Sequence, residues 1–312
     1  MRSTLSAQTT HATITPLDLG YHNLKEGLAA FLIKTEEGPI LVESGPAKCI
    51  EALKSALAAH GTELGEIKHV FLTHIHLDHG GASGQLTAAG ATVHVHPIGA
   101  PHLIDPAKLN SSARRVFGDA LDLWLGELQA SPAEQISVVE ADQTITVGNA
   151  RFRAVQTPGH ASHHHAWLLE MGAERHLFTG DVAGMRIPDT EFATLPLVAP
   201  EFDRDLWAES IQVVRALAPD AMWLTHFGRV RDQQAFLDQV ADRVQRESAF
   251  ISQLLDSHPD AQPESLIPEY QAWQLELAKA AGVPEETLAR YCPPGHYTAN
   301  IIGVRRWRSR RD

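Results

Sequence analysis

The stretch Val70-Phe71-Leu72-Thr73-His74-Ile75-His76-Leu77-Asp78-His79-Gly80-Gly81 is the most informative segment of this chain. It begins with a continuous apolar run of strand length, which indicates a buried strand. Three histidines and one aspartate follow, and imidazole and carboxylate groups are the ligands that zinc and similar ions bind. The two glycines predict a tight turn where the backbone approaches another segment closely. The segment therefore predicts a metal site in a loop at a strand end.

Three later segments repeat this arrangement of an apolar run followed by a possible ligand. They are Thr157-Pro158-Gly159-His160, Phe178-Thr179-Gly180-Asp181 and Leu224-Thr225-His226-Phe227-Gly228. Each segment alone is weak evidence, because a solitary aspartate beside glycine is usually a turn or cap residue. Their common position after a strand-like run indicates that they complete the site begun by the first segment.

With these motifs the chain resembles the metallo-beta-lactamase superfamily over about residues 12–230, and its first segment matches the H-x-H-x-D-H motif of that family in full. The resemblance implies seven metal ligands, which are His74, His76 and His160 for a first ion, Asp78, His79 and His226 for a second, and Asp181 as the bridge between both ions. True beta-lactamases commonly have cysteine at the bridging position. The aspartate points instead to the hydrolase branch with glyoxalase II, the acyl-homoserine lactonases and the RNase Z-like enzymes.

One departure from the family pattern is Glu43-Ser44-Gly45, where many members carry Asp-Thr-Gly. This position supports ligands and does not bind metal itself. Each ligating imidazole needs a partner for its other ring nitrogen, and Glu43 is a candidate for that partner.

The resemblance implies a metal-dependent hydrolase that uses a metal-bound hydroxide on an ester, lactone or thioester. Two divalent ions about 3.5–4 Å apart can share a hydroxide and lower the pKa of bound water from 15.7 to about 7. Zinc is the first expectation for both ions, and iron or manganese also suits these ligands. The residues expected to act in catalysis are Asp78, His164 and Asp181, with Asp78 or the bridging hydroxide managing the proton passed to the leaving group.

Other functions stay open on the sequence alone. A mononuclear iron sulfur dioxygenase of the same superfamily would use two histidines and one aspartate, here His74, His160 and Asp181. A phosphodiesterase or RNase-like hydrolase is disfavoured by the acidic balance of the chain. A non-catalytic metal-binding protein is disfavoured by the complete ligand set.

The substrate is the least defined part of the prediction. The residues after Asp181 do not match the segment characteristic of glyoxalase II. Leu195–Phe202 reads as a rigid apolar loop near the site, and Arg186 is a candidate polar anchor for the substrate, with a plain surface role equally open. The expected partner is a small molecule, and a homodimer is possible.

Composition permits one large domain or a domain with an extension, since the chain has 312 residues of which 44% are hydrophobic. We expect no membrane span, because no apolar run reaches about 18 residues, and no signal peptide. Cys49 and Cys292 are far apart, which favours a reducing, cytoplasmic setting. The formal net charge of -12 argues against nucleic-acid binding. Five arginines over 305–311 are expected to form a solvated terminal helix, with an anion-binding patch as the alternative.

The order of elements predicts an α/β fold, and the resemblance implies a four-layer αβ/βα sandwich. Strands are expected over 12–19, 28–34, 39–43, 70–72 and 92–96, with further strands between 136 and 178. Helices are expected after Ser44, over about 82–89 and after Asp203, with Ser44 and Asp203 as N-caps.

Two stretches lie outside this alternation. Residues 98–135 form a helical insertion with one apolar stripe that includes Phe117 and Trp124, and it either packs on the sandwich or forms a lid that places Phe117 at the substrate entrance. Residues 231–312 form a C-terminal helical extension to the catalytic domain over 1–230, with Pro259, Pro263 and Pro268 as helix breakers. The extension packs on the domain, forms a pocket wall or makes a dimer contact.

The run His160-Ala-Ser-His163-His164-His165 contains more histidines than the motif requires. His163 and His165 are expected to be structural polar residues on one face, whereas His164 supports a ligand or the substrate. His94 and His96, on a predicted strand, are also expected to be structural.

Overall fold

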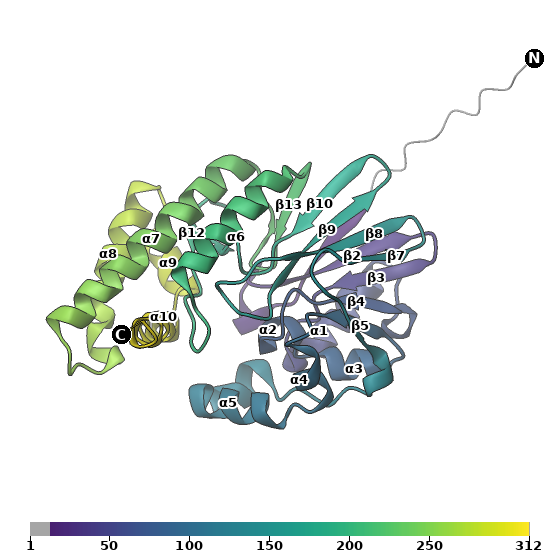
Figure 1. The fold of residues 1–312 in the computed structure, drawn as a ribbon, viewed down its shortest axis with the longest axis horizontal. Helices are drawn as coiled ribbons and strands as arrows, with labels where there is room; N and C mark the ends of the chain where they lie inside the picture. Colours follow the sequence, from purple (N-terminus) through teal and green to yellow (C-terminus); the bar gives the residue numbers. More distant parts are fainter. Residues whose placement is uncertain (1–12, 312) are drawn as a thin grey trace, which may run out of the picture.

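The computed structural model describes residues 13–311, and there the chain forms two six-stranded sheets packed face to face, with helices on both outer faces (Figure 1). This arrangement confirms the predicted four-layer α/β sandwich. The predicted start of the first strand at Ala12, and the segment on which the signal-peptide expectation depends, lie outside the described residues.

The first sheet has the strand order β1-β2-β3-β4-β5-β6. Its strands are β1 (Ile14–Asp18), β2 (Ala29–Thr35), β3 (Gly38–Val42), β4 (His69–Phe71), β5 (Thr92–Val95) and β6 (Ile136–Val138). The first three strands pair antiparallel, and β3 to β6 run parallel. The parallel part places the end of β4, with the first motif, in the middle of the sheet.

The second sheet has the order β14-β13-β10-β9-β8-β7. Its strands are β7 (Thr144–Val147), β8 (Ala150–Gln156), β9 (His165–Met171), β10 (Glu174–Phe178), β13 (Ala221–Leu224) and β14 (Gly228–Arg229). A short hairpin of β11 (Met185–Arg186) and β12 (Ala193–Thr194) leaves this sheet after β10. Since β10 and β13 are parallel, the segments after both strands emerge at the same edge.

Side-chain alternation along the central strands explains the layers. In β2, Phe31 and Ile33 join the apolar layer between the sheets, together with Trp167 of β9. Their neighbours Ala30 and Leu32 point to the opposite face, where the helices of the first half pack. Both faces of β2 are therefore covered, which is why its sequence is a continuous apolar run.

Helices cover the two outer faces. On the first sheet these are α1 (Ile50–Ala59), α2 (Leu77–Gly80), α3 (Ser83–Ala88), α4 (Ala100–Ile104) and α5 (Ala107–Phe117); on the second it is α6 (Arg204–Leu217). The predicted cap of α6 is confirmed, because the Asp203 carboxylate accepts from the Asp205 and Leu206 amides at 3.0 and 3.1 Å. The predicted cap of α1 is wrong, since a 3-10 turn at Ala47–Cys49 precedes this helix and its N-cap is Cys49.

The insertion lies between β5 and β6, but its predicted single stripe is broken. Gly118 ends α5 with a φ of 53°, and a π-helical segment follows at Leu121–Leu125. Val116 and Phe117 are consequently 67% and 47% exposed. The chain changes direction at Gly118, so residues on either side of it no longer share one helical face.

The C-terminal extension consists of α7 (Gln233–Ser257), α8 (Pro263–Ala280), α9 (Glu285–Tyr291) and α10 (Pro294–Ser309), and it lies beyond α6 in Figure 1. Its apolar residues share one buried cluster with the second sheet and α6. Pro268 lies inside α8 and does not end it, contrary to the prediction. None of the helices in residues 13–311 is long and apolar enough to cross a membrane.

The terminal arginines are not simply solvated. Arg310 donates to the carbonyls of Pro200 and Phe202, and the Arg308 guanidinium donates to Ser252 O at 2.8 Å. Arg311 lies over the Trp307 ring at 5.0 Å. These contacts tie the end of α10 to α7 and to the loop before α6.

Candidate metal centre

Four strand ends bring the predicted ligands to one edge of the sandwich. The loop after β4 carries His74 and His76, and α2 carries Asp78 and His79. Across the gap between the sheets, the His165 amide donates to Thr73 O at 2.7 Å and the Trp167 indole donates to Leu72 O at 2.8 Å. The second sheet therefore fixes the backbone from which the first motif starts.

The glycines of the first motif serve close approach rather than a tight turn. Gly80 ends the one-turn helix α2, and Gly81 has an ordinary helical φ of -61°. A Cβ at Gly81 would lie 2.1 Å from Leu77 O and 2.9 Å from Ala47 N. Position 81 has no space for a side chain, which allows the motif to pack against the start of α1.

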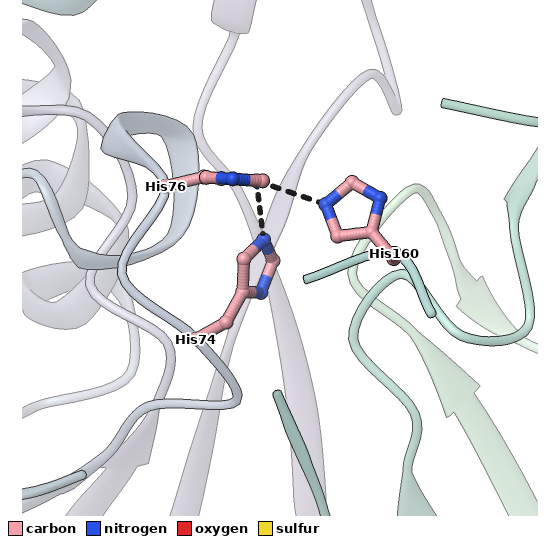
Figure 2. A group of neighbouring side chains, drawn as sticks. All are labelled: His74, His76 and His160. Atoms are coloured by element: carbon pink, nitrogen blue, oxygen red, sulfur yellow. Dashed lines mark hydrogen bonds between the residues drawn. The ribbon is translucent and has the colours of Figure 1, made fainter. Parts of the chain in front are cut away.

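His74, His76 and His160 form the first ligand group (Figure 2). His76 Nδ1 lies 3.0 Å from His74 Nε2 and 2.8 Å from His160 Nε2. Three nitrogen atoms from two sheets thus converge on one point. Such an arrangement of imidazoles is a metal-binding geometry that needs few other residues.

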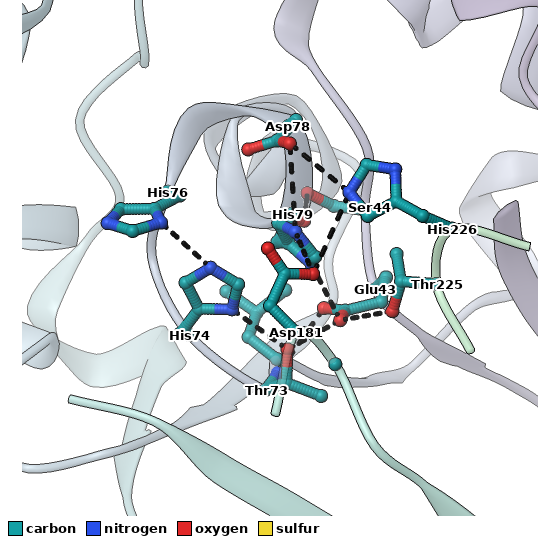
Figure 3. A network of polar contacts seen from close by, with 12 residues as sticks. Glu43, Ser44, Thr73, His74, His76, Asp78, His79, Asp181, Thr225 and His226 are labelled. Carbon is teal, nitrogen blue, oxygen red and sulfur yellow. Dashed lines mark hydrogen bonds and ion pairs between the residues drawn. The ribbon is translucent and has the colours of Figure 1, made fainter. Parts of the chain in front are cut away.

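Asp78, His79 and His226 form the second ligand group (Figure 3). Asp78 Oδ2 lies 3.4 Å from His226 Nε2 and 3.7 Å from His79 Nε2. The side chain of Asp78 is 26% exposed, against 0% for His79 and 10% for His226. The second group therefore opens to solvent through its carboxylate.

Asp181 lies between the two groups and faces each with a different oxygen. Its Oδ2 is 3.4 Å from His160 Nε2 in the first group. Its Oδ1 is 3.2 Å from His79 Nε2 and 3.7 Å from His226 Nε2 in the second. This is the placement that a carboxylate shared by two ions requires.

Protein acceptors fix the outer nitrogen of four ligand histidines. The Nδ1 of His160 lies 2.9 Å from Pro196 O, that of His226 lies 3.0 Å from Gly27 O, and that of His79 lies 3.0 Å from Glu43 Oε1. Carbonyl and carboxylate oxygens only accept, so each Nδ1 carries the proton and, in the neutral ring, each Nε2 presents a lone pair inward.

His74 follows the same rule through a hydroxyl. The Thr73 hydroxyl donates to Glu43 Oε1 at 2.6 Å, so its oxygen can accept from His74 Nδ1 at 3.1 Å. The Thr225 hydroxyl donates to the same Glu43 oxygen at 3.1 Å. The prediction that Glu43 supports a ligand is thereby confirmed, and Glu43 supports His79 directly and His74 through Thr73.

Ser44 belongs to this support and not to the start of α1. Its hydroxyl donates to His79 O at 2.8 Å, and the amides of Ser44 and Gly45 donate to the same carbonyl at 2.9 and 3.1 Å. Residues 43–45 therefore hold both the side chain and the backbone of His79.

The charges of the two groups differ. Burial lowers the pKa of His74 and His76 well below 6.5, and neighbouring imidazoles lower it further. Burial also lowers the pKa of His79, but the carboxylates of Asp181, Asp78 and Glu43 outweigh it and raise that pKa well above 6.5. The first group is a cluster of neutral imidazoles, and the second is rich in carboxylates.

Two buried atoms test whether the residues fit metal ions. His79 Nε2 and Asp181 Oδ1 are inaccessible to solvent and lie 3.2 Å apart, and outside the ligand set neither has a hydrogen-bond partner among the described residues. Buried polar atoms without partners are rare, because each costs the free energy of its lost hydration. Both atoms point to the place between the ligands of the second group, so a divalent ion there would satisfy them.

His164 is fully buried behind Asp181. Its Nε2 accepts from the Asp181 amide at 3.1 Å, and its Nδ1 lies 2.8 Å from the Thr157 hydroxyl. Both ring nitrogens are thus engaged within the protein. His164 therefore supports the backbone of Asp181, as one of the two alternatives expected, and its part in catalysis stays a prediction.

Arg186 and Phe117, the two predicted substrate contacts, stay predictions, and the structure shows their protein environment. The Arg186 guanidinium donates twice to Phe227 O, at 2.8 and 3.2 Å, and once to Glu191 at 3.3 Å, so it braces the segment after His226. Phe117 is exposed at the end of α5.

Another residue of the insertion does lie near the site. The Trp124 ring stacks on His22 with centroids 4.6 Å apart and an interplanar angle of 17°. Burial and the nearby Asp78 carboxylate raise the pKa of Tyr21, and burial lowers that of His22 although Asp78 opposes this. We call Tyr21, His22 and Trp124 the rim, because the Asp78 carboxylate is near enough to affect the pKa of Tyr21 and His22, and Trp124 stacks on His22.

Sequence reasoning missed the rim because Tyr21 and His22 belong to no motif. Only the structure reveals an unusual backbone here, because His22, Asn23 and Glu26 all have φ between 55° and 57°. Non-glycine residues in this region are uncommon and gather at functional sites. Thr73 and Thr225 had a sequence signal, as each directly precedes a ligand histidine.

Comparison with known proteins agrees with this geometry. The profile of the metallo-beta-lactamase superfamily matches residues 28–226. The metallo-beta-lactamase fold-containing protein ST1585 of Sulfurisphaera tokodaii is 31% identical over 185 residues, which cover 58% of this chain and 68% of that protein. An atrochrysone carboxyl ACP thioesterase of Aspergillus fumigatus is 24% identical over 241 residues, which cover 76% of this chain and 46% of the thioesterase. This chain therefore spans less than half of that fungal relative.

Solved structures show the same fold. The metallo-beta-lactamase family protein TTHA1429 of Thermus thermophilus aligns with a TM-score of 0.65 at 18% identity, covering 96% of this chain and 93% of that one. The high coverage includes the C-terminal extension. From the profile match and its relatives, together with the ligand set at the strand ends, the chain belongs to the metallo-beta-lactamase superfamily of metal-dependent hydrolases.

Proposed function

We propose that this chain is a dinuclear metallo-hydrolase that cleaves an ester, lactone or thioester. The observation that carries the proposal is the position of Asp181, whose two oxygens face two different ligand groups at 3.2–3.7 Å. A site for one ion would need only about three protein ligands and would not require a second group. The buried atoms His79 Nε2 and Asp181 Oδ1, which have no partner outside the ligand set, support the same conclusion.

Divalent ions bound here would polarise a carbonyl group and lower the pKa of a water molecule to about 7. The residues of the chain prepare this chemistry. The outer acceptors hold His74, His79, His160 and His226 in the tautomer that presents Nε2 inward, and Asp181 faces both ligand groups. Asp78 is the ligand carboxylate with access to solvent, so it is suited to hold the proton that the leaving group receives.

The rim is the part of the protein that a substrate would meet. Trp124 and Tyr21 offer apolar ring surface and His22 offers a hydrogen-bonding nitrogen, and the Asp78 carboxylate acts on both Tyr21 and His22. An apolar wall with few polar groups suits an acyl chain better than a phosphodiester. The thioesterase of Aspergillus fumigatus makes a thioester the first substrate to test.

Two measurements test the proposal together. Elemental analysis of fully loaded protein is expected to give close to two ions per chain. A panel of thioesters, esters, lactones and a phosphodiester is expected to show turnover of an acyl substrate. That turnover should be lost on chelation, return with zinc, cobalt or manganese, and persist without oxygen.

A His226→Gln variant separates the dinuclear proposal from a mononuclear one. It should bind one ion fewer and lose most activity, whereas a substitution of His102 on α4, away from the ligands, should leave both unchanged. A protein that never binds more than one ion would refute the dinuclear site. A rate that follows dissolved oxygen and returns only with ferrous iron would favour the sulfur dioxygenase instead.

A further inference from the structure

A buried asparagine of the C-terminal extension holds the loop that orients His160. Asn300 of α10 is 0% exposed. Its Oδ1 accepts from the Leu197 amide at 2.8 Å, and its Nδ2 donates to Leu195 O at 2.8 Å. One side chain thus binds the backbone on both sides of Pro196.

Pro196 connects this contact to the first ligand group. Its carbonyl accepts from His160 Nδ1 at 2.9 Å, while His160 Nε2 lies 2.8 Å from His76 Nδ1 and 3.4 Å from Asp181 Oδ2. A movement of the Pro196 carbonyl would rotate the imidazole and change where its lone pair points. The position of one ligand therefore depends on a residue more than a hundred positions later in the chain.

A second, independent feature of α10 shows how tightly it meets the loop. A Cβ on Gly303 would lie 1.7 Å from Leu197 O and 2.8 Å from the Leu197 carbonyl carbon. Gly303 lies inside the helix, so space and not backbone conformation requires glycine there. Asn300 and Gly303 are one turn apart and face the same loop, as residues three apart on a helix do.

A buried polar network behind Asn300 fixes the direction of its amide. The Tyr270 hydroxyl donates to the Glu247 carboxylate, so its oxygen accepts from Asn300 Nδ2 at 2.9 Å. Gln274 also donates to Glu247, at 3.3 Å, and the Arg243 guanidinium lies 3.6 Å from it. With Nδ2 directed to Tyr270 and Leu195, the Asn300 oxygen must face the Leu197 amide.

We propose that the C-terminal extension is a positioning element for the metal centre, in which Asn300 sets the orientation of His160 through Pro196 and thereby the affinity of the first ligand group for its ion. The inference rests on the proposed metal centre. Support of a ligand by an outer group typically changes metal affinity by about 10–100-fold.

The test uses the full chain with metal removed, and titrates it with zinc against a chromophoric chelator. Asn300→Leu keeps the side-chain volume and removes both contacts to the loop. Gly303→Ala pushes on Leu197 without touching the polar network. Ile302→Ala, at an exposed position on the same helix, is the matched control. His160→Gln is the comparison for loss of the ligand itself.

We expect Asn300→Leu and Gly303→Ala each to weaken one of the two zinc ions about 10–100-fold and to leave the other unchanged. Neither variant should add to the effect of His160→Gln, because all three act on the same ligand. Ile302→Ala should bind zinc as the unsubstituted chain does. If Asn300→Leu does not fold, the zinc affinity of Gly303→Ala tests the inference.

Two outcomes would overturn the inference. Affinity for both ions could stay unchanged in the folded variants, or it could fall equally for both ions in parallel with thermal stability, as a purely structural role predicts. Failure of the proposed function looks different, because then the unsubstituted chain binds no zinc or His160→Gln leaves zinc binding intact.

Discussion

The two ligand groups lie side by side, yet one histidine in each is held by a different part of the chain. In the first group, His160 depends on the Pro196 carbonyl, and this loop is held by Asn300 in the extension. In the second group, His79 depends on the Glu43 carboxylate at the end of β3, within the sandwich itself. His160 is thus held by a neutral backbone oxygen that the extension fixes, and His79 by a charge within the sandwich.

The groups also differ in how much negative charge they offer an ion. Asp181 is the one carboxylate that the first group shares, whereas the second has Asp181, Asp78 and, behind them, Glu43. We therefore expect substitutions that move a ligand to weaken metal binding mainly in the first group. Substitutions that remove a charge should weaken it mainly in the second.

The largest effect is expected for Asp181→Ala, which removes the residue common to both groups. Two cations would then face each other with less compensation, so the second ion should be lost first. Activity should fall about a thousandfold or more, since an ion contributes several kcal/mol and about 1.4 kcal/mol corresponds to tenfold. Metal content and turnover are measured together, with exposed Asp260→Ala as the control. Unchanged metal content would refute the bridging role.

Glu43→Gln tests whether the charge of a carboxylate supports metal binding in the second group. It keeps the size of the side chain and removes the carboxylate that accepts from His79, Thr73 and Thr225. We expect the second ion to bind about 10–100-fold more weakly. Exposed Glu37→Gln serves as the control.

Double variants locate the effect of Glu43→Gln. Combined with His226→Gln, Glu43→Gln should weaken metal binding little further. Combined with His160→Gln, the two losses of metal affinity should add, as they do for independent sites. The opposite pattern would mean that Glu43 acts mainly on the first group, through Thr73 and His74.

A smaller effect is expected for His164→Leu, which removes the acceptor of the Asp181 amide without touching a ligand atom. An unsatisfied buried amide costs about 1–3 kcal/mol of folding free energy, which urea unfolding measures. Turnover should fall about tenfold through misplacement of Asp181, while both ions are retained. A loss as large as that of Asp181→Ala, at full metal content, would return His164 to a direct part in catalysis.

The ligands could be predicted from sequence because each follows an apolar strand and carries an unambiguous chemical type. The same holds for the layers, since the run at β2 is apolar on both faces. A side-chain support such as Glu43 could also be predicted, but the supports that act through the backbone could not. Pro196 and Gly27 act through backbone carbonyls, which every residue has, so their identity carries no signal.

The sequence also predicted one continuous apolar stripe through the insertion, which the structure interrupts. A regular helical period aligned Phe117 with Trp124, but Gly118 interrupts that period and turns Phe117 to solvent. Trp124 instead meets His22, a residue far away in the sequence. Periodicity identifies one face of a continuous helix, and it fails where the chain leaves the helix between the residues compared.

The smallest expected effect concerns the rim, which borders the second group only. Trp124→Ala removes the ring that stacks on His22 beside Asp78. An aromatic pair contributes about 0.5–1.5 kcal/mol, so we expect KM for an acyl substrate to rise about two- to tenfold at unchanged kcat and metal content. Phe117→Ala, in the same insertion but 47% exposed, is the matched control and should leave both kinetic constants unchanged. If Trp124→Ala lowers stability while the surviving protein keeps its KM, the insertion only packs on the sandwich. If Phe117→Ala raises KM instead, the substrate enters over α5, and the rim does not contact it.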